Sequence, residues 1–133
     1  MASILKVDTI TGVTTAGSIA VTGEGNSTTT NLQQGLIKIW LKMNGSGTIA
    51  ENDSFNVSSF VDNGTGDYSA NVTNAMGNAD YAATASTGSS DVFANITGGS
   101  QATSLLRYTS YYFSHGAKLD RDQLYVIAAG DLA

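Results

Sequence analysis

The chain has no cysteine and no proline, and it has one histidine and one tryptophan. Without cysteine it can form no disulfide, no thiolate-ligated zinc site and no iron–sulfur cluster, and it has no cysteine nucleophile. A single histidine, His115, excludes most histidine metal sites and leaves one candidate base for a Ser-His-Asp arrangement. The lack of cysteine also fits folding in a reducing cytoplasm.

Charge is scarce as well. Charged residues make up 13% of the chain, with six Lys+Arg against eleven Asp+Glu and a pI near 4.4. Nucleic-acid binders carry a basic face for phosphate contacts, so no nucleic-acid partner is expected. No apolar run approaches the roughly 18 residues that span a bilayer, and no signal-peptide core follows the first residues. We expect a soluble chain that is made in a cytoplasm, with no membrane insertion.

Ser, Thr, Asn, Gly and Ala fill more than half of the 133 positions, and apolar residues recur among them with period two. That alternation predicts strands rather than disorder. Over residues 36–133 it predicts seven or eight short strands, including one lined by Tyr68, Ala70 and Val72 and one at Leu124–Ala129. Asn44-Gly45 predicts a two-residue turn, and 62–67 predicts another turn. The expected fold class is all-β, with 36–133 as an antiparallel, jelly-roll-like β-sandwich head domain.

Residues 1–35 form a separate segment, in which apolar residues are spread among Thr and Gly. We expect short extended pieces that cannot fold alone and must pair with another copy or another protein. Residues 26–35 read as a linker with one helical turn, capped by Ser27 and ending before Gly35. The candidate assembly residues of this segment are Ile4, Leu5, Val7, Ile10, Val13, Ile19, Val21 and Leu32.

Two polar motifs have ordinary structural explanations. Asn-x-Ser/Thr recurs, but glycosylation requires secretion, whereas alternate strand positions make Asn56/Ser58, Asn71/Thr73 and Asn95/Thr97 polar stripes. Gly64-Thr65-Gly66-Asp67 resembles a fragment of a calcium-binding repeat, but one copy lacks the ligands, so a hairpin turn is favoured. No metal or cofactor is predicted.

The acidic residues and His115 fall mainly in predicted turns, and 118–122 reads as a charged turn, so we expect no catalytic residues and no enzyme. Aromatic residues are more informative, because Tyr and Trp rings bind sugars and are common at subunit interfaces. Burial in a core is the alternative for each of them. Four lie on strand faces opposite the apolar stripes and the fifth, Tyr111, lies in the same run; the candidate receptor contacts are Trp40, Tyr108, Tyr111, Tyr112 and Tyr125.

Four stretches carry a family resemblance. The start, Met1-Ala-Ser-Ile-Leu-Lys-Val-Asp-Thr-Ile-Thr-Gly-Val-Thr-Thr-Ala-Gly-Ser-Ile19, resembles the N-termini of fibre-like virion proteins of tailed phages, those of marine bacteria and cyanobacteria above all. Asp53-Ser-Phe-Asn-Val-Ser-Ser59, with Asp62-Asn-Gly-Thr-Gly-Asp-Tyr68 and Asn74-Ala-Met-Gly-Asn-Ala-Asp-Tyr81, resembles the head domain of such fibres. The resemblance covers residues 1–81.

The resemblance implies a short homotrimeric fibre or spike on a virion, with an intertwined stalk docked on another virion protein through residues 1–35. The knob, 36–133, would contact a host surface glycan or protein. Two alternatives stay open. One is a capsid decoration or head-fibre protein with a purely structural role. The other is a filament subunit that assembles by strand exchange. Stoichiometry and location on the particle separate these hypotheses.

Overall fold

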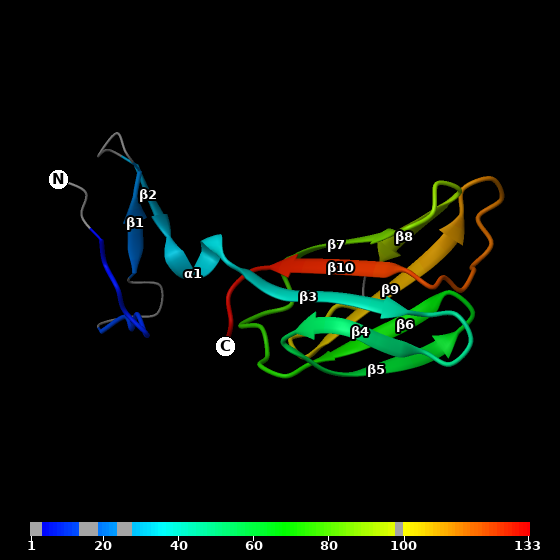
Figure 1. Ribbon diagram of the computed structural model, residues 1–133, viewed down its shortest axis with the longest axis horizontal. Coiled ribbons are helices and arrows are strands. Elements are labelled where there is room, and N and C mark those ends of the chain that lie inside the picture. The colour runs from blue at the N-terminus through cyan, green and yellow to red at the C-terminus, as the bar shows by residue number, and fades with distance from the viewer. Residues whose placement is uncertain (1–3, 14–18, 24–27, 98–99) are drawn as a thin grey trace. The chain divides into compact units, whose positions relative to one another are not determined.

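The computed structural model describes residues 4–13, 19–23, 28–97 and 100–133 (Figure 1). The chain divides into two compact units, residues 1–35 and 36–133. Within the described ranges there is no helix long and apolar enough to cross a membrane.

Within its described residues, the first unit contains two short strands and a single helical turn. Strands β1 (Ala20–Thr22) and β2 (Thr29–Asn31) pair antiparallel, and α1 (Leu32–Gly35) follows directly. Asn31 caps this turn, because its side-chain oxygen accepts a hydrogen bond of 3.1 Å from the amide of Gln34. The predicted cap, Ser27, lies outside the described residues, and Gly35 is the last residue of the turn rather than the first beyond it.

The described part of the second unit contains eight strands, which confirms the predicted all-β class and strand number. They form two four-stranded antiparallel sheets, which we call the first sheet, β4-β3-β10-β7, and the second sheet, β5-β6-β9-β8. The strands are β3 (Ile37–Asn44), β4 (Ala50–Phe55), β5 (Val57–Gly64), β6 (Asp67–Val72), β7 (Ala82–Thr87), β8 (Val92–Ile96), β9 (Leu105–Tyr112) and β10 (Leu124–Ala129).

The two sheets bury one apolar stripe each in a common core. Alternation places every second residue of a strand on the same face, so each sheet has one apolar side. The first sheet contributes residues of β3 and β10, and the second contributes residues of β6 and β9. The most buried of these are Ile39, Met43, Tyr68, Ala70, Leu106, Tyr108, Leu124, Val126 and Ala128.

The chain passes from the first sheet to the second at Asn56, between β4 and β5. Asn56 has a left-handed backbone with φ of 62°, which asparagine tolerates better than most residues. Its side-chain amide donates to the carbonyls of Lys38 and Asn74, and its side-chain oxygen accepts from the amide of Asn74. The prediction that Asn56 and Ser58 share a strand face is therefore wrong, because Asn56 is the break between strands.

The predicted two-residue turn at Asn44-Gly45 is also wrong. Asn44 pairs with Ala50, so residues 45–49 form the loop of this hairpin. Gly45 turns inward instead, and its amide donates to the carbonyl of Arg121 at 2.7 Å. A Cβ at Gly45 would lie 2.6 Å from the ring of Tyr68, so this close approach requires glycine.

Candidate functional site

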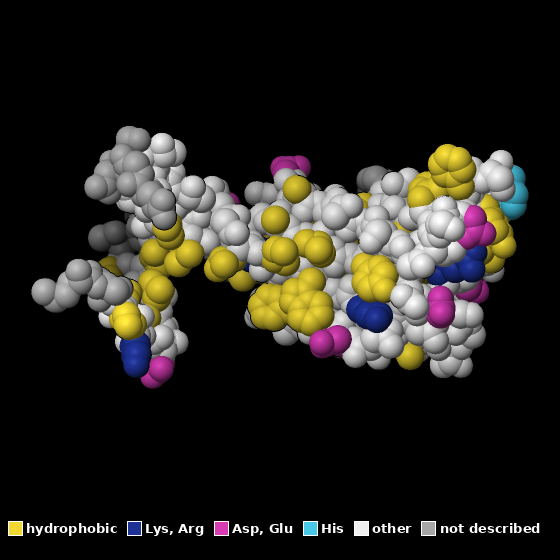
Figure 2. Space-filling model, turned by 45° about the horizontal axis from the view of Figure 1, so that its top comes forward, with side chains coloured by type: hydrophobic (Ala, Val, Ile, Leu, Met, Phe, Trp, Pro, Cys, Tyr) yellow, Lys and Arg dark blue, Asp and Glu magenta, His cyan; other side chains and the backbone are white. Residues whose placement is uncertain are grey.

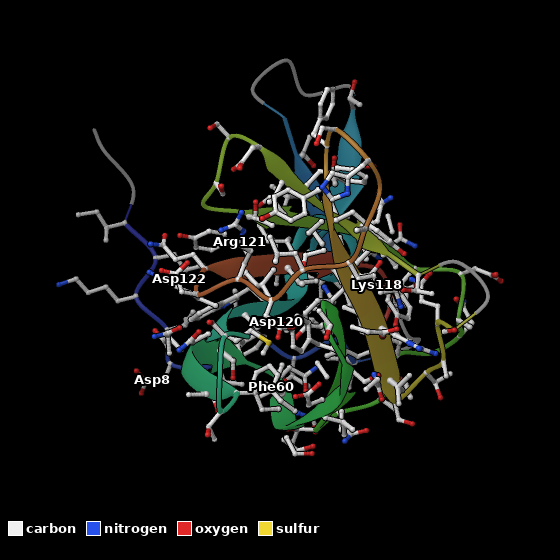
Figure 3. The ribbon with its side chains drawn as sticks, turned by 90° about the vertical axis from the view of Figure 1, so that its right-hand side faces the viewer. Asp8, Phe60, Lys118, Asp120, Arg121 and Asp122 are labelled. Carbon is white, nitrogen blue, oxygen red and sulfur yellow. The ribbon has the colours of Figure 1, made fainter. Side chains whose placement is uncertain are left out.

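The loops 45–49, 65–66, 88–91 and 113–123 gather at one end of the sandwich, which we call the distal end (Figures 1 and 3). It lies opposite the end at which Leu36 enters the unit and at which β10 finishes. Connecting loops on a rigid sandwich are the usual position for binding residues. Figure 3 looks onto this end and labels Lys118, Asp120, Arg121 and Asp122.

A buried carboxylate anchors the distal end. Asp67, at the start of β6, is 4% exposed and accepts two hydrogen bonds of 2.7 Å from the guanidinium of Arg107. Lys118 also forms an ion pair with this carboxylate. The hydrogen bond from Arg107 is the main cause that lowers the pKa of Asp67 to about 2, and Lys118 adds to it against the opposing effect of burial. This contact ties the loop 113–123 to the second sheet.

Asp120 makes a second attachment of the same loop. Its side-chain oxygen accepts from the amide of Gly66 and from the hydroxyl of Tyr68, each at 2.6 Å. Burial and the nearby Asp120 both raise the pKa of Tyr68. At Gly66 the backbone is left-handed, with φ of 62°, and a Cβ would lie 2.5 Å from the amide nitrogen of Leu119. The loop can therefore pack this closely only on a glycine.

Aromatic and charged side chains meet on the loop fixed in this way. Tyr112 packs against His115 with ring centroids 4.7 Å apart, and the guanidinium of Arg121 lies 5.8 Å from the centroid of the Tyr112 ring. Arg121 also approaches Asp91 at 3.7 Å. Phe113 lies between Tyr112 and His115 in the chain and is 81% exposed. We call Asp91, Tyr112, Phe113, His115 and Arg121 the distal aromatic cluster.

The structure separates the five aromatic residues expected to contact a receptor. Tyr112 belongs to the distal aromatic cluster, and Tyr111 stacks on Phe93 on the outer face of the second sheet, with centroids 5.5 Å apart. Trp40 and Tyr125 lie on the outer face of the first sheet. They therefore do not form one site.

The prediction for Tyr108 is wrong. Its side chain is fully buried in the core, where its hydroxyl donates to the sulfur of Met43, and burial raises its pKa. The alternation of β9 was read correctly as two faces, but the face with Leu106 and Tyr108 packs inward. Tyr108 is thus unable to touch a receptor.

The apolar residues predicted for assembly lie largely in solvent within the first unit. Ile4 is 77% exposed, Leu5 81% and Val13 95%. Val7, Ile10 and Val21 are exposed by more than half, and Ile19 and Leu32 are partly buried. Among the described residues of this unit, no apolar side chain is buried.

The calcium-like fragment forms the predicted turn between β5 and β6. Asp62 accepts from the amide of Gly64, and Asp67 faces two cations rather than an open site. Across the described ranges, no group of three or more His, Asp or Glu side chains is placed to hold a metal ion. This turn is therefore a structural hairpin whose acidic groups serve the fold.

Sequence reasoning missed the roles of the charged run 118–122. A charged turn was expected, with no role assigned to its residues, whereas Lys118 and Asp120 hold the loop, and Arg121 pairs with Asp91 and Tyr112. The available signal was the mixture of both charge signs close to the tyrosines of β9. Apart from Tyr112, their partners lie about 30 to 50 residues away in the chain, so the local pattern did not identify them.

Comparison with protein-family models, curated proteins and solved structures finds no match for this chain. The class that the structure defines is an all-β protein with two antiparallel four-stranded sheets in its described residues. Any statement about function therefore rests on the sequence and on the surfaces described above.

Proposed function

We propose that the chain is a structural protein of a tailed-phage virion that forms a short homotrimeric fibre or spike. In this proposal residues 1–35 intertwine as a stalk and dock on another virion protein. Residues 36–133 form the exposed knob, which contributes to host attachment. The protein is made in the host cytoplasm and acts on the virion, without catalysis.

The observation that carries the proposal is the exposure of Ile4, Leu5 and Val13 in the first unit. Apolar side chains this exposed, in a unit whose described residues bury no apolar side chain, have no core of their own and favour a partner surface. The two strands of this unit have three residues each, which is too little to be stable alone in water. Two further copies of the segment and a virion protein are the partners that the N-terminal resemblance implies.

The distal aromatic cluster supports the attachment role. It combines exposed and half-buried rings with the cation of Arg121 and the anion of Asp91. Rings bind the apolar faces of sugars or apolar protein side chains, while the charged groups orient polar ones. A host surface glycan or protein is the expected partner.

Deletion of residues 1–25 tests the assembly role. We expect the shortened chain to keep a folded knob, read by cooperative thermal unfolding, and to be lost from virions. Complete unfolding of the shortened chain would show that the boundary at residue 35 is misplaced. Incorporation of the shortened chain at the normal level would contradict the anchoring role.

Attachment is tested with the purified full-length protein, which should bind host cells and block phage adsorption. Phe113→Ala should reduce the blocking, whereas Val61→Ala on the edge strand β5, a second exposed apolar residue outside the distal aromatic cluster, should not. Failure of the wild-type protein to bind or to block would remove the attachment role and leave a capsid decoration or head-fibre role.

Strand exchange into a filament is the second candidate, because the small β1–β2 sheet has three-residue strands whose described side chains are largely exposed. Sedimentation of the purified protein separates the two. A closed trimer supports the fibre or spike, and open-ended growth supports the filament.

A further inference from the structure

The outer face of the first sheet is apolar over the half nearest Leu36. Two rows of residues that pair across neighbouring strands cover that half. The exposed fractions of the large apolar side chains in these rows run from 38% for Trp40 to 51% for Phe55. Figure 2 shows hydrophobic side chains gathered on one face of the molecule. We call these two rows the apolar face; they are Phe55–Trp40–Ile127–Thr84 and Ile37–Ala129–Ala82.

The apolar face has a raised side and a hollow side. Phe55 and Trp40, on β4 and β3, carry its two aromatic rings. On β10 and β7 the small side chains leave a shallow hollow of about 270 Å³, lined by Ala82, Ala83, Thr84, Ile127 and Ala129. A ridge and a hollow on the same face are complementary to a second copy of that face.

One anion and one cation lie beside the apolar face. The next cross-strand row pairs Asp53 with Lys42, and Tyr125 follows on β10, with the Lys42 ammonium 5.6 Å from its ring centroid. One anion and one cation side by side give no net field for a strongly acidic or basic partner. A second copy docked ridge to hollow places the uncharged members of this row on β10 and β7, Tyr125 and Ser86, against the pair, so no like charges meet.

The size of the face determines how firmly copies could bind. Four strands spaced about 4.8 Å apart and about six residues long make an outer face of roughly 400 Å², of which the apolar face covers about half. A stable interface usually buries about 800 Å² per partner, so this face alone supports only a weak contact. Chains already joined elsewhere present their knobs to one another at millimolar effective concentration, which is enough to populate a weak contact.

We infer that the apolar face is a contact between knobs of neighbouring copies, with the Phe55–Trp40 ridge of one copy in the Ala82–Ala129 hollow of the next. This inference rests on the proposed assembly through residues 1–35, because that assembly supplies the effective concentration. It adds a second interface, within 36–133, to the one expected in the stalk.

Trp40 reports on this contact directly, because it is the one tryptophan of the chain. The experiment measures quenching of its fluorescence by acrylamide in the full-length protein, together with the mass in solution. Ala82→Lys fills the hollow with a charged side chain two strands away from Trp40, so it does not alter the surroundings of Trp40 within its own chain. Asn95→Lys on β8, exposed on the outer face of the second sheet, adds the same charge as a control.

We expect Trp40 to be shielded in the assembled wild-type protein and in Asn95→Lys. In Ala82→Lys we expect its quenching constant to rise at least about twofold, while the mass stays that of the assembly held by residues 1–35. Loss of one central interface contact commonly weakens an association about 30-fold, which is enough to open this contact. Thermal unfolding shows whether both variants are folded. If Ala82→Lys does not fold, Thr84→Lys on the same face takes its place in the experiment.

Other outcomes overturn the inference. Equal quenching in the assembled wild type and in Ala82→Lys would show that the face is open to solvent in the assembly. Shielding of Trp40 in a monomer would show that another part of the same chain, such as residues 4–13, covers the face. A chain that stays monomeric with Trp40 exposed would refute both the knob contact and the proposed assembly, whereas an assembled chain with Trp40 exposed would refute the knob contact alone.

Discussion

On the outer face of the second sheet, polar side chains bond to one another and the rings of Phe93 and Tyr111 stack, whereas the outer face of the first sheet carries exposed apolar side chains on three neighbouring strands. Asn71 donates to Ser59, Asn63 donates to Ser69, and Arg107 pairs with Asp67. The rings of Trp40 and Phe55 lie across neighbouring strands of the first sheet. The contacts of the second face therefore stabilise the fold, while the apolar side chains of the first face remain available to a partner.

The largest expected effect is at Gly66, in the hairpin of the second sheet. Gly66→Ala should lower the free energy of unfolding by about 3 kcal/mol or more, because the Cβ would lie 2.5 Å from the Leu119 amide nitrogen in a left-handed backbone. Denaturant unfolding measures the change. Gly47→Ala, in the hairpin loop of the first sheet, has a similar φ of 70° but open space around the Cβ. It should cost about 1–2 kcal/mol, from backbone strain alone.

The next effect concerns the carboxylate of Asp67. Asp67→Asn should cost about 2 kcal/mol at neutral pH, because Arg107 and Lys118 lose their anion. The folded pKa of Asp67, about 2, is below its ordinary value of 3.8, so its contribution is complete above about pH 4 and is lost as the pH falls toward 2. Thermal unfolding across this range should show that loss in the wild type and not in Asp67→Asn.

Asp53→Asn is the matched control on the first sheet, since Asp53 is exposed. It should change the stability by no more than about 0.5 kcal/mol. If Asp67→Asn and Asp53→Asn lost the same free energy of unfolding, the difference between the two outer faces would be refuted for their acidic residues.

The smallest expected effect is on the apolar face. Phe55→Ser should lower the stability of the unassembled chain by less than about 1 kcal/mol, because the side chain is half exposed on an edge strand. Phe93→Ser, on the edge strand β8 of the second sheet, should cost more, since it removes the stacking of Phe93 on Tyr111. Chemical denaturation of both variants at low protein concentration gives the comparison. A loss of several kcal/mol in Phe55→Ser would mean that the fold itself uses this face.

The strands were predictable from local pattern where one face is buried. The alternation of Tyr68, Ala70 and Val72 marked β6, and Leu124–Ala129 coincides with β10. These predictions hold because period-two burial is a property of each strand by itself. The switch between sheets at Asn56 was missed, since the residues on both sides of it are strand-like.

The candidate site was less predictable. Tyr112 was expected as a surface contact and lies in the distal aromatic cluster, but Tyr108, four residues earlier, fills the core. Alternation shows that a strand has two faces, and only packing against the opposite sheet decides which face is inward. The partners of Lys118 and Asp120 likewise depend on a hairpin more than fifty residues away.

The sequence by itself determined an all-β chain without thiol chemistry, and it predicted the strands of the second unit, because composition and period-two spacing act locally. The tertiary structure decided which aromatic rings reach the surface and which charges hold the distal loop. It also decided that the polar side chains and the stacked rings of one outer face contact one another, while the other face carries exposed apolar side chains on three neighbouring strands. These features depend on which strands become neighbours, and strand pairing joins residues that are far apart in the chain.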